Sequence, residues 1–128
     1  MRILVDTHLV LWASAKSRRL PKEARSLLED PGNELFFSAA SLWEIAIKAT
    51  LRRSDFRVDL ALLRSALAAM DFIELPVSGA HAEKLAALPP IHKDPFDRML
   101  VAQSRSEPLL LLTNDAVLAA YGEGIKVV

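Results

Sequence analysis

The 128-residue sequence contains no cysteine and no apolar run long enough to cross a bilayer. Without cysteine the chain forms no disulfide and no thiolate site, which fits a protein of the reducing cytoplasm. A membrane helix needs about 20 consecutive apolar residues, so we expect no association with a membrane. The N-terminal stretch does not read as a signal peptide either, because Asp6 and His8 interrupt its apolar run.

An excess of charge of one sign is also missing, since 16 Lys and Arg balance 16 Asp and Glu. The composition therefore gives no global indication of a nucleic-acid partner. Basic residues do gather in two groups, within residues 16–25 and 48–64, and the second group contains the candidate RNA contacts Lys48, Arg52 and Arg53. Ordinary solvated helix faces have the same composition, so both interpretations stay open.

Hydrophobic residues make up 52% of the chain, which is typical of a globular protein and fits a single domain over residues 1–128. Short apolar runs predict five strands, at residues 3–5, 35–37, 72–75, 109–112 and 126–128. Helical spacing of apolar residues separates them. This alternation predicts an α/β fold with a parallel sheet and helices on both of its faces.

Several polar residues stand where helices should begin. We expect Thr7, Asp59 and Asp94 to be N-caps, and we expect Pro21 and Pro95 to open helices in the first turn. We expect Ser78 to begin a further helix that runs through Leu88. We expect a last helix over residues 115–121, ending near a glycine.

Carboxylates follow two of the predicted strands. Asp6 stands at the end of the first strand and Asp115 just after the fourth, while Glu44 and Asp97 lie on helices that could flank the same edge. Ligands of open α/β sheets gather beyond the carboxyl ends of the strands, so we expect these acids to converge. Each also has a structural explanation. Asp6 could cap a helix, Glu44 could complete a capping box with Ser41, and Asp115 could lie in a first helical turn.

Clustered carboxylates repel one another unless a cation lies between them. Oxygen ligands without cysteine indicate a hard ion, Mg²⁺ or Mn²⁺, which proteins combine with water and substrate phosphates. Such an ion activates a bound water and offsets charge on phosphate oxygens. The pattern therefore favours metal-assisted phosphoryl chemistry.

Four segments of the chain resemble the motifs of the PIN-domain family, and specifically the VapC-type toxin ribonucleases of toxin–antitoxin pairs. They are residues 5–8 (VDTH), 38–48 (SAASLWEIAIK), 94–103 (DPFDRMLVAQ) and 112–116 (LTNDA). They follow the family order at family-like separations over essentially the whole chain. The resemblance implies a PIN-like three-layer fold, with a five-stranded parallel sheet in the order 3-2-1-4-5 and the first strand in the centre.

The resemblance also implies the chemistry. It places catalytic and metal-binding roles on Asp6, Glu44, Asp97 and Asp115, with Mg²⁺ as cofactor and Mn²⁺ as a substitute. RNA would be cut by a metal-activated water, leaving 5′-phosphate and 3′-hydroxyl ends.

Supporting roles and partners follow from the same resemblance. Thr7, Thr113 and Asn114 fit partners of the acids or of a bound water, Arg98 fits a phosphate or an acid, and Asp94 fits an N-cap better than a ligand. The family further implies a homodimer and a small VapB-like antitoxin whose tail covers the active site. Trp12, Trp43, Phe56 and the leucines after Asp59 could supply an apolar groove for that tail.

Two other functions remain open at this point. His8, His81 and His92 could serve a metal-free ribonuclease that uses histidines as acid and base and leaves a cyclic phosphate. A non-catalytic module could keep the fold and only bind RNA or protein.

Overall fold

The computed structural model describes residues 1–51 and 58–128. Its centre is a sheet of five parallel strands in the order β3-β2-β1-β4-β5, as expected. The strands are β1 (Arg2–Val5), β2 (Glu34–Ser38), β3 (Phe72–Leu75), β4 (Leu110–Thr113) and β5 (Ile125–Val127). The candidate RNA contacts Arg52 and Arg53, and the groove candidate Phe56, lie outside the described residues.

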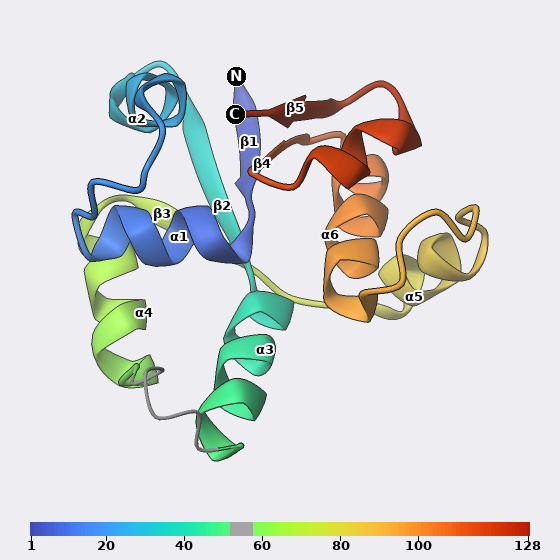
Figure 1. Cartoon of the computed structure of the whole chain (residues 1–128), viewed down its shortest axis with the longest axis horizontal. Coiled ribbons are helices and arrows are strands. Elements are labelled where there is room, and N and C mark those ends of the chain that lie inside the picture. Colours follow the sequence, from blue (N-terminus) through green and yellow to red (C-terminus); the bar gives the residue numbers. More distant parts are fainter. Residues whose placement is uncertain (52–57) are drawn as a thin grey trace.

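Helices cover the two faces of the sheet in three layers (Figure 1). The helices are α1 (Thr7–Ser14), α2 (Lys22–Glu29), α3 (Ala39–Thr50), α4 (Leu60–Ala69), α5 (Gly79–Ala86), α6 (Pro95–Ser106) and the 3₁₀ helix η1 (Ala116–Tyr121). Figure 1 shows α1, α2 and α4 on one side of β1, and α5 and α6 on the other. None of the helices among the described residues has the length and apolar character needed to cross a membrane.

The sequence of β1 explains why the sheet needs cover on both faces. Successive side chains of a strand point to opposite sides, and Ile3, Leu4 and Val5 are all fully buried. Ile3 and Val5 pack in one core with residues of α1 and α4, whereas Leu4 packs in a second core with residues of α6 and η1. A continuous apolar strand of this kind is typical of a parallel sheet.

Most of the predicted helix starts are confirmed, and two are wrong. Asp59, Ser78 and Asp94 each cap a helix by accepting backbone N–H groups. The cap of α1 is Asp6 and not Thr7, which is already helical. Pro21 precedes α2 as its N-cap residue instead of lying in its first turn.

The proposed capping box at Ser41 and Glu44 is also wrong. Ser38 caps α3, and its hydroxyl accepts a hydrogen bond from the N–H of Ala40 at 3.0 Å. Ser41 and Glu44 therefore lie inside the helix, where neither is required for capping. Glu44 is buried with 5% of its surface exposed, so its burial needs another explanation.

Candidate functional site

The first and fourth strands end side by side at one edge of the sheet. Val5 on β1 pairs with Leu112 on β4, so the residues that follow them come out next to each other. Asp6 follows β1 directly, and Asp115 follows Thr113 at the end of β4. Parallel pairing thus brings together two acids that the sequence predicted to meet.

Asp6 is held from three directions. One of its oxygens, Oδ2, accepts hydrogen bonds from Thr113 Oγ1 at 2.5 Å and from the N–H of Asn114 at 3.1 Å. The other, Oδ1, accepts the N–H of Leu9 at 3.0 Å and so caps α1. Burial raises the pKa of Asp6, although these three hydrogen bonds oppose that effect. The capping explanation and the site explanation for Asp6 are compatible, because one oxygen serves each.

Glu44 reaches the same edge from α3. Its Oε1 lies 2.9 Å from the hydroxyl of Thr7, which also lies 2.8 Å from Ser41 Oγ. A hydroxyl has one proton, so Thr7 can donate to Glu44 while it accepts from Ser41. The other oxygen, Oε2, lies 2.8 Å from Lys48 Nζ. Lys48, a candidate RNA contact, is thus engaged with an acid of the site.

Asp97 lies in the first turn of α6, among the other acids. The pKa of its carboxyl is raised to about 7, and burial is the largest cause. The negative charge of Asp94 adds to this rise, and so do the charges of Glu44 and Asp6, while His92 opposes it. A carboxyl whose pKa is raised this far ionises in the metal-free protein only at a cost in free energy. The predicted acids therefore do share one region.

Asp115 completes the group through a residue that the sequence analysis did not place there. His92 Nε2 lies 2.7 Å from Asp115 Oδ2 and 3.4 Å from Asp97 Oδ2. Burial alone would raise the pKa of Asp115, but its favourable contacts, chiefly the hydrogen bonds from His92 and from the N–H of Val117, together outweigh burial and leave that pKa lowered. Thr113 Oγ1 accepts the N–H of Asp115 at 3.0 Å while it donates to Asp6, so one hydroxyl links the two acids.

The remaining candidates face other neighbours. Asp94 caps α6 by accepting the N–H groups of Phe96 and Asp97. Arg98 donates to the carbonyl oxygens of Leu85 and Leu88, so its side chain points toward α5 and the C-terminal end of that helix. The Asn114 side chain donates to Val128 O, so only its backbone N–H reaches Asp6.

The histidines, all three of which lie in the described part of the chain, do not form a catalytic pair. His81 is buried, accepts the N–H of Ser78 at Nδ1 and lies 2.6 Å from Glu107 through Nε2. His92 contacts Asp115 instead, and His8 is exposed. A sequence signal for His92 does exist, because it stands two residues before the N-cap Asp94, where a ring nitrogen can accept the N–H of that residue.

A parallel sheet in the order 3-2-1-4-5 with buried acids at its carboxyl edge is the arrangement expected of a PIN-like α/β protein. The PIN domain model matches residues 3–124, and the chain belongs to this family. A comparison with curated proteins gave no match.

Two solved structures share the fold. One is VapBC2 from Rickettsia felis bound to a DNA fragment from its promoter, with 13% identity, a TM-score of 0.67 and coverage of 100% of this chain and 98% of that one. The other is a toxin–antitoxin complex from Klebsiella pneumoniae, with 22% identity, a TM-score of 0.67 and coverage of 98% and 96%. At these identities the likeness establishes the fold.

Proposed function

We propose that the chain is a VapC-like toxin, an Mg²⁺-dependent endoribonuclease that hydrolyses RNA phosphodiester bonds. The observation that carries the proposal is the crowding of carboxyls around Asp97, whose pKa is raised to about 7. A cation among these acids would relieve both their repulsion and the cost of burying their charge. The family and the toxin–antitoxin assignment of the two similar structures support the same conclusion.

The residues present fit a hard divalent ion. Asp6, Glu44, Asp97 and Asp115 offer oxygen ligands, which Mg²⁺ and Mn²⁺ prefer. When bound, the ion supplies an activated water and offsets charge on the phosphate. The chain orients the acids. Thr113 and the N–H of Asn114 fix Asp6, as the hydroxyl of Thr7 fixes Glu44.

The negatively charged RNA backbone is repelled by the carboxylates at this edge of the sheet. We propose that the basic residues that follow the buried part of α3, Lys48, Arg52 and Arg53, contact the RNA backbone. Phosphate contacts of this kind steer a substrate without reading its sequence. A cytoplasmic location, where RNA is available, is part of the same proposal.

Metal binding and RNA cleavage, measured on the same variants, test the function. Asp97→Asn removes a ligand and should abolish both Mg²⁺ binding in calorimetry and RNA cleavage in gels, with the fold confirmed by circular dichroism. Asp94→Asn keeps an N-cap of equal quality and should retain much of the activity. Glu83→Gln, at an exposed position on α5, is the control for loss of one charge.

The outcomes separate the possible functions. Cleavage that stops on chelation and yields 5′-phosphate ends supports the proposal. Cyclic phosphate ends formed without metal would instead indicate histidine chemistry. RNA binding with no cleavage under any metal would identify a non-catalytic module.

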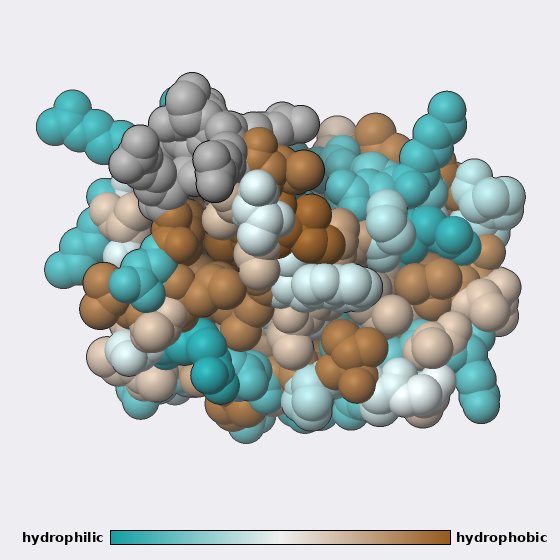
Figure 2. Space-filling model, turned by 90° about the horizontal axis from the view of Figure 1, so that it is seen from below, coloured by the Kyte–Doolittle hydropathy of each residue, from teal (hydrophilic) through white to brown (hydrophobic). Residues whose placement is uncertain are grey.

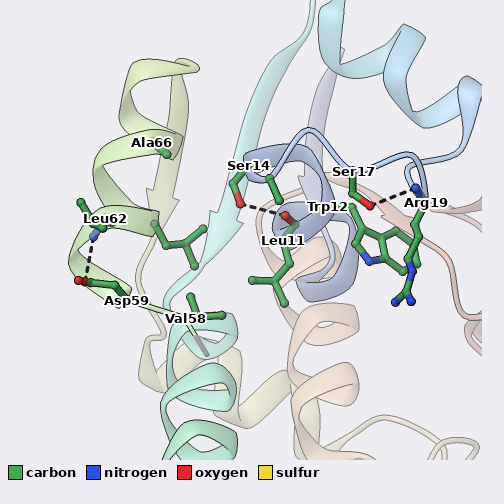
Figure 3. A pocket seen from close by; sticks show the side chains of 11 residues that line it. Leu11, Trp12, Ser14, Ser17, Arg19, Val58, Asp59, Leu62 and Ala66 are labelled. Atoms are coloured by element: carbon green, nitrogen blue, oxygen red, sulfur yellow. Dashed lines mark hydrogen bonds between the residues drawn. The ribbon is translucent and has the colours of Figure 1, made fainter. Parts of the chain in front are cut away.

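We propose that a VapB-like antitoxin docks its apolar segment in a groove between α1 and α4. The groove has a volume of about 530 Å³, and Leu11 and Trp12 line one side while Leu62 and Ala66 line the other (Figure 3). Leu62 is 68% exposed and shares this groove with other apolar side chains, and contiguous exposed apolar surface often marks an interaction site. Figure 2 shows hydrophobic surface spread over the α4 side of the molecule.

Co-purification with the cognate antitoxin tests this groove. Leu62→Asp should weaken complex formation and leave RNA cleavage by the free toxin intact, because Leu62 lies outside the acidic site. Val117→Asp changes a residue that is also exposed, at 52%, on η1 and should leave the complex unchanged. Equal behaviour of the two variants would place the antitoxin elsewhere.

We further propose that a second copy of the chain covers Trp43, which is 65% exposed. Trp43 packs edge-to-face on Phe96 with ring centres 5.5 Å apart, beside an apolar cavity of about 410 Å³ between α3, α5 and α6. Trp43→Ser should convert a dimer to a monomer in light scattering. Leu62→Ser, on the other side of the sheet, should not.

A further inference from the structure

His92 lies between two of the proposed metal ligands and has no role assigned by the family resemblance. Its side chain is 16% exposed, and Nε2 lies 2.7 Å from Asp115 Oδ2 and 3.4 Å from Asp97 Oδ2. These three side chains offer atoms that all lie within 4.8 Å of one another. Imidazole is a common metal ligand, so the arrangement by itself is compatible with direct coordination.

The contact made by Nδ1, on the opposite edge of the His92 ring, shows which ring nitrogen carries the proton. His92 Nδ1 lies 3.0 Å from the backbone N of Asp94 and accepts its N–H. A backbone N–H can only donate, so Nδ1 is unprotonated. The proton of the neutral ring is then on Nε2 and points at Asp115.

The backbone of His92 is fixed as well. Its N–H donates to the hydroxyl of Tyr121 at 3.0 Å, and Tyr121 is a buried residue of η1. The ring is thus held by the helix cap of α6 on one edge, while η1 holds the backbone of the same residue. A rotation of the ring would break its hydrogen bonds to Asp94 and Asp115 together.

Coordination through Nε2 requires a lone pair where the structure places a proton. His92 could ligate a metal only if the ring changed tautomer, and the new Nδ1–H would then face the N–H of Asp94. Donation from Nε2–H leaves Asp115 able to ligate, because each carboxylate oxygen has two lone pairs.

We propose that His92 is a positioning residue that orients Asp115 toward the divalent ion by hydrogen bonding and is not itself a ligand. The inference rests on the proposed metal-dependent function. In other metalloproteins, residues that hydrogen-bond to a metal ligand orient that ligand, and their loss typically weakens metal affinity 10- to 100-fold. The bond from His92 would orient Asp115 in the same way.

The test combines a spectroscopic signature with Mg²⁺ affinity, and neither needs RNA. In protein labelled with ¹⁵N-histidine, long-range ¹H–¹⁵N spectra should show His92 protonated at Nε2, both without and with Mg²⁺. His92→Leu should weaken Mg²⁺ binding in calorimetry about 10- to 100-fold. His92→Gln, whose amide can donate from a position near Nε2, should restore most of it.

His8→Leu is the matched control for loss of a histidine, and at pH 8 it should leave the Mg²⁺ affinity unchanged. His8 lies near enough to influence the pKa of Asp6 and of Asp115, yet among the described residues it makes no hydrogen bond to either. Loss of the Nε2 proton on addition of Mg²⁺ would show direct ligation and overturn the proposal. If a folded His92→Leu variant bound Mg²⁺ with unchanged affinity while Asp97→Asn bound none, the role of His92 would be refuted and the proposed metal site would stand. A wild-type chain that binds no Mg²⁺ would overturn the proposed function as well.

Discussion

Replacement of Asp97 by Asn should stabilise the metal-free protein at neutral and alkaline pH. In the folded chain, burial and the neighbouring acids raise the pKa of Asp97 to about 7 from the reference value of 3.8. The folded state therefore keeps a proton on this carboxyl over a pH range in which the unfolded state has lost it. Stability that depends on this proton is present at low pH and is lost as the pH rises from about 4 to about 7.

The size of the effect follows from the same two values. Each pKa unit corresponds to 1.36 kcal/mol. The interval between 3.8 and about 7 then gives at most about 4 kcal/mol of stability lost across the range. Asn cannot ionise, so the variant should lack this loss. Asp6 and Asp115 titrate in both proteins, and their effects largely cancel in the difference between the two.

Urea unfolding followed by circular dichroism at pH 5 and pH 8, in the presence of a chelator, measures that difference. We expect Asp97→Asn to gain on the wild type by about 2–3 kcal/mol between the two pH values, because at pH 5 the unfolded carboxyl has already lost its proton and part of the full effect is present there. Mg²⁺ at a hundredfold excess over its Kd should then return about 2.7 kcal/mol to the wild type alone. A difference that is the same at both pH values would refute the reasoning, because it would mean that Asp97 is not perturbed by its neighbours.

Three further changes have expected outcomes. Thr113→Val removes the hydroxyl that donates to Asp6 and should cost roughly 2 kcal/mol and weaken Mg²⁺ binding, whereas Thr113→Ser should retain both properties in calorimetry. Ser38→Ala removes the cap of α3 and should lower the free energy of unfolding by about 1 kcal/mol in urea, with Ser38→Asp close to the wild type. Charge reversal at Arg52 and Arg53 should flatten the dependence of log K for RNA on log salt by about 0.7 for each phosphate that is no longer neutralised, and an unchanged slope would assign both residues to plain surface.

The sheet could be predicted from sequence because its signals are local. Each strand is a short apolar run, and the alternation with helices limits the topology to a parallel arrangement. The caps at Asp59 and Asp94 are equally local, since each acid stands directly before an apolar helical pattern. The convergence of Asp6 and Asp115 then follows from parallel pairing of β1 and β4.

The features that were missed depend on contacts distant in sequence. The pattern Ser41 to Glu44 satisfies the capping-box spacing, but β2 ends at Ser38, so α3 begins earlier than the pattern suggests. No periodicity reveals that the loop containing His92 returns to Asp115, because a hydrogen bond to Tyr121, 29 residues away, fixes its path. The orientation of the Arg98 side chain likewise depends on where α5 ends, and the sequence of α6, on which Arg98 lies, does not reveal this.

The bond between Asp6 and Thr113 joins positions 107 residues apart, and it has a consequence for synthesis of the protein. A ribosome adds about 5–20 residues per second, so roughly 5–20 s separate the appearance of the two partners. Throughout that interval β1, the central strand, lacks its neighbour β4, and Asp6 lacks the hydroxyl that orients it. Under the proposed function, a ribonuclease built in this way is inert while it is being translated, which protects the messenger RNA and the ribosome that produce it.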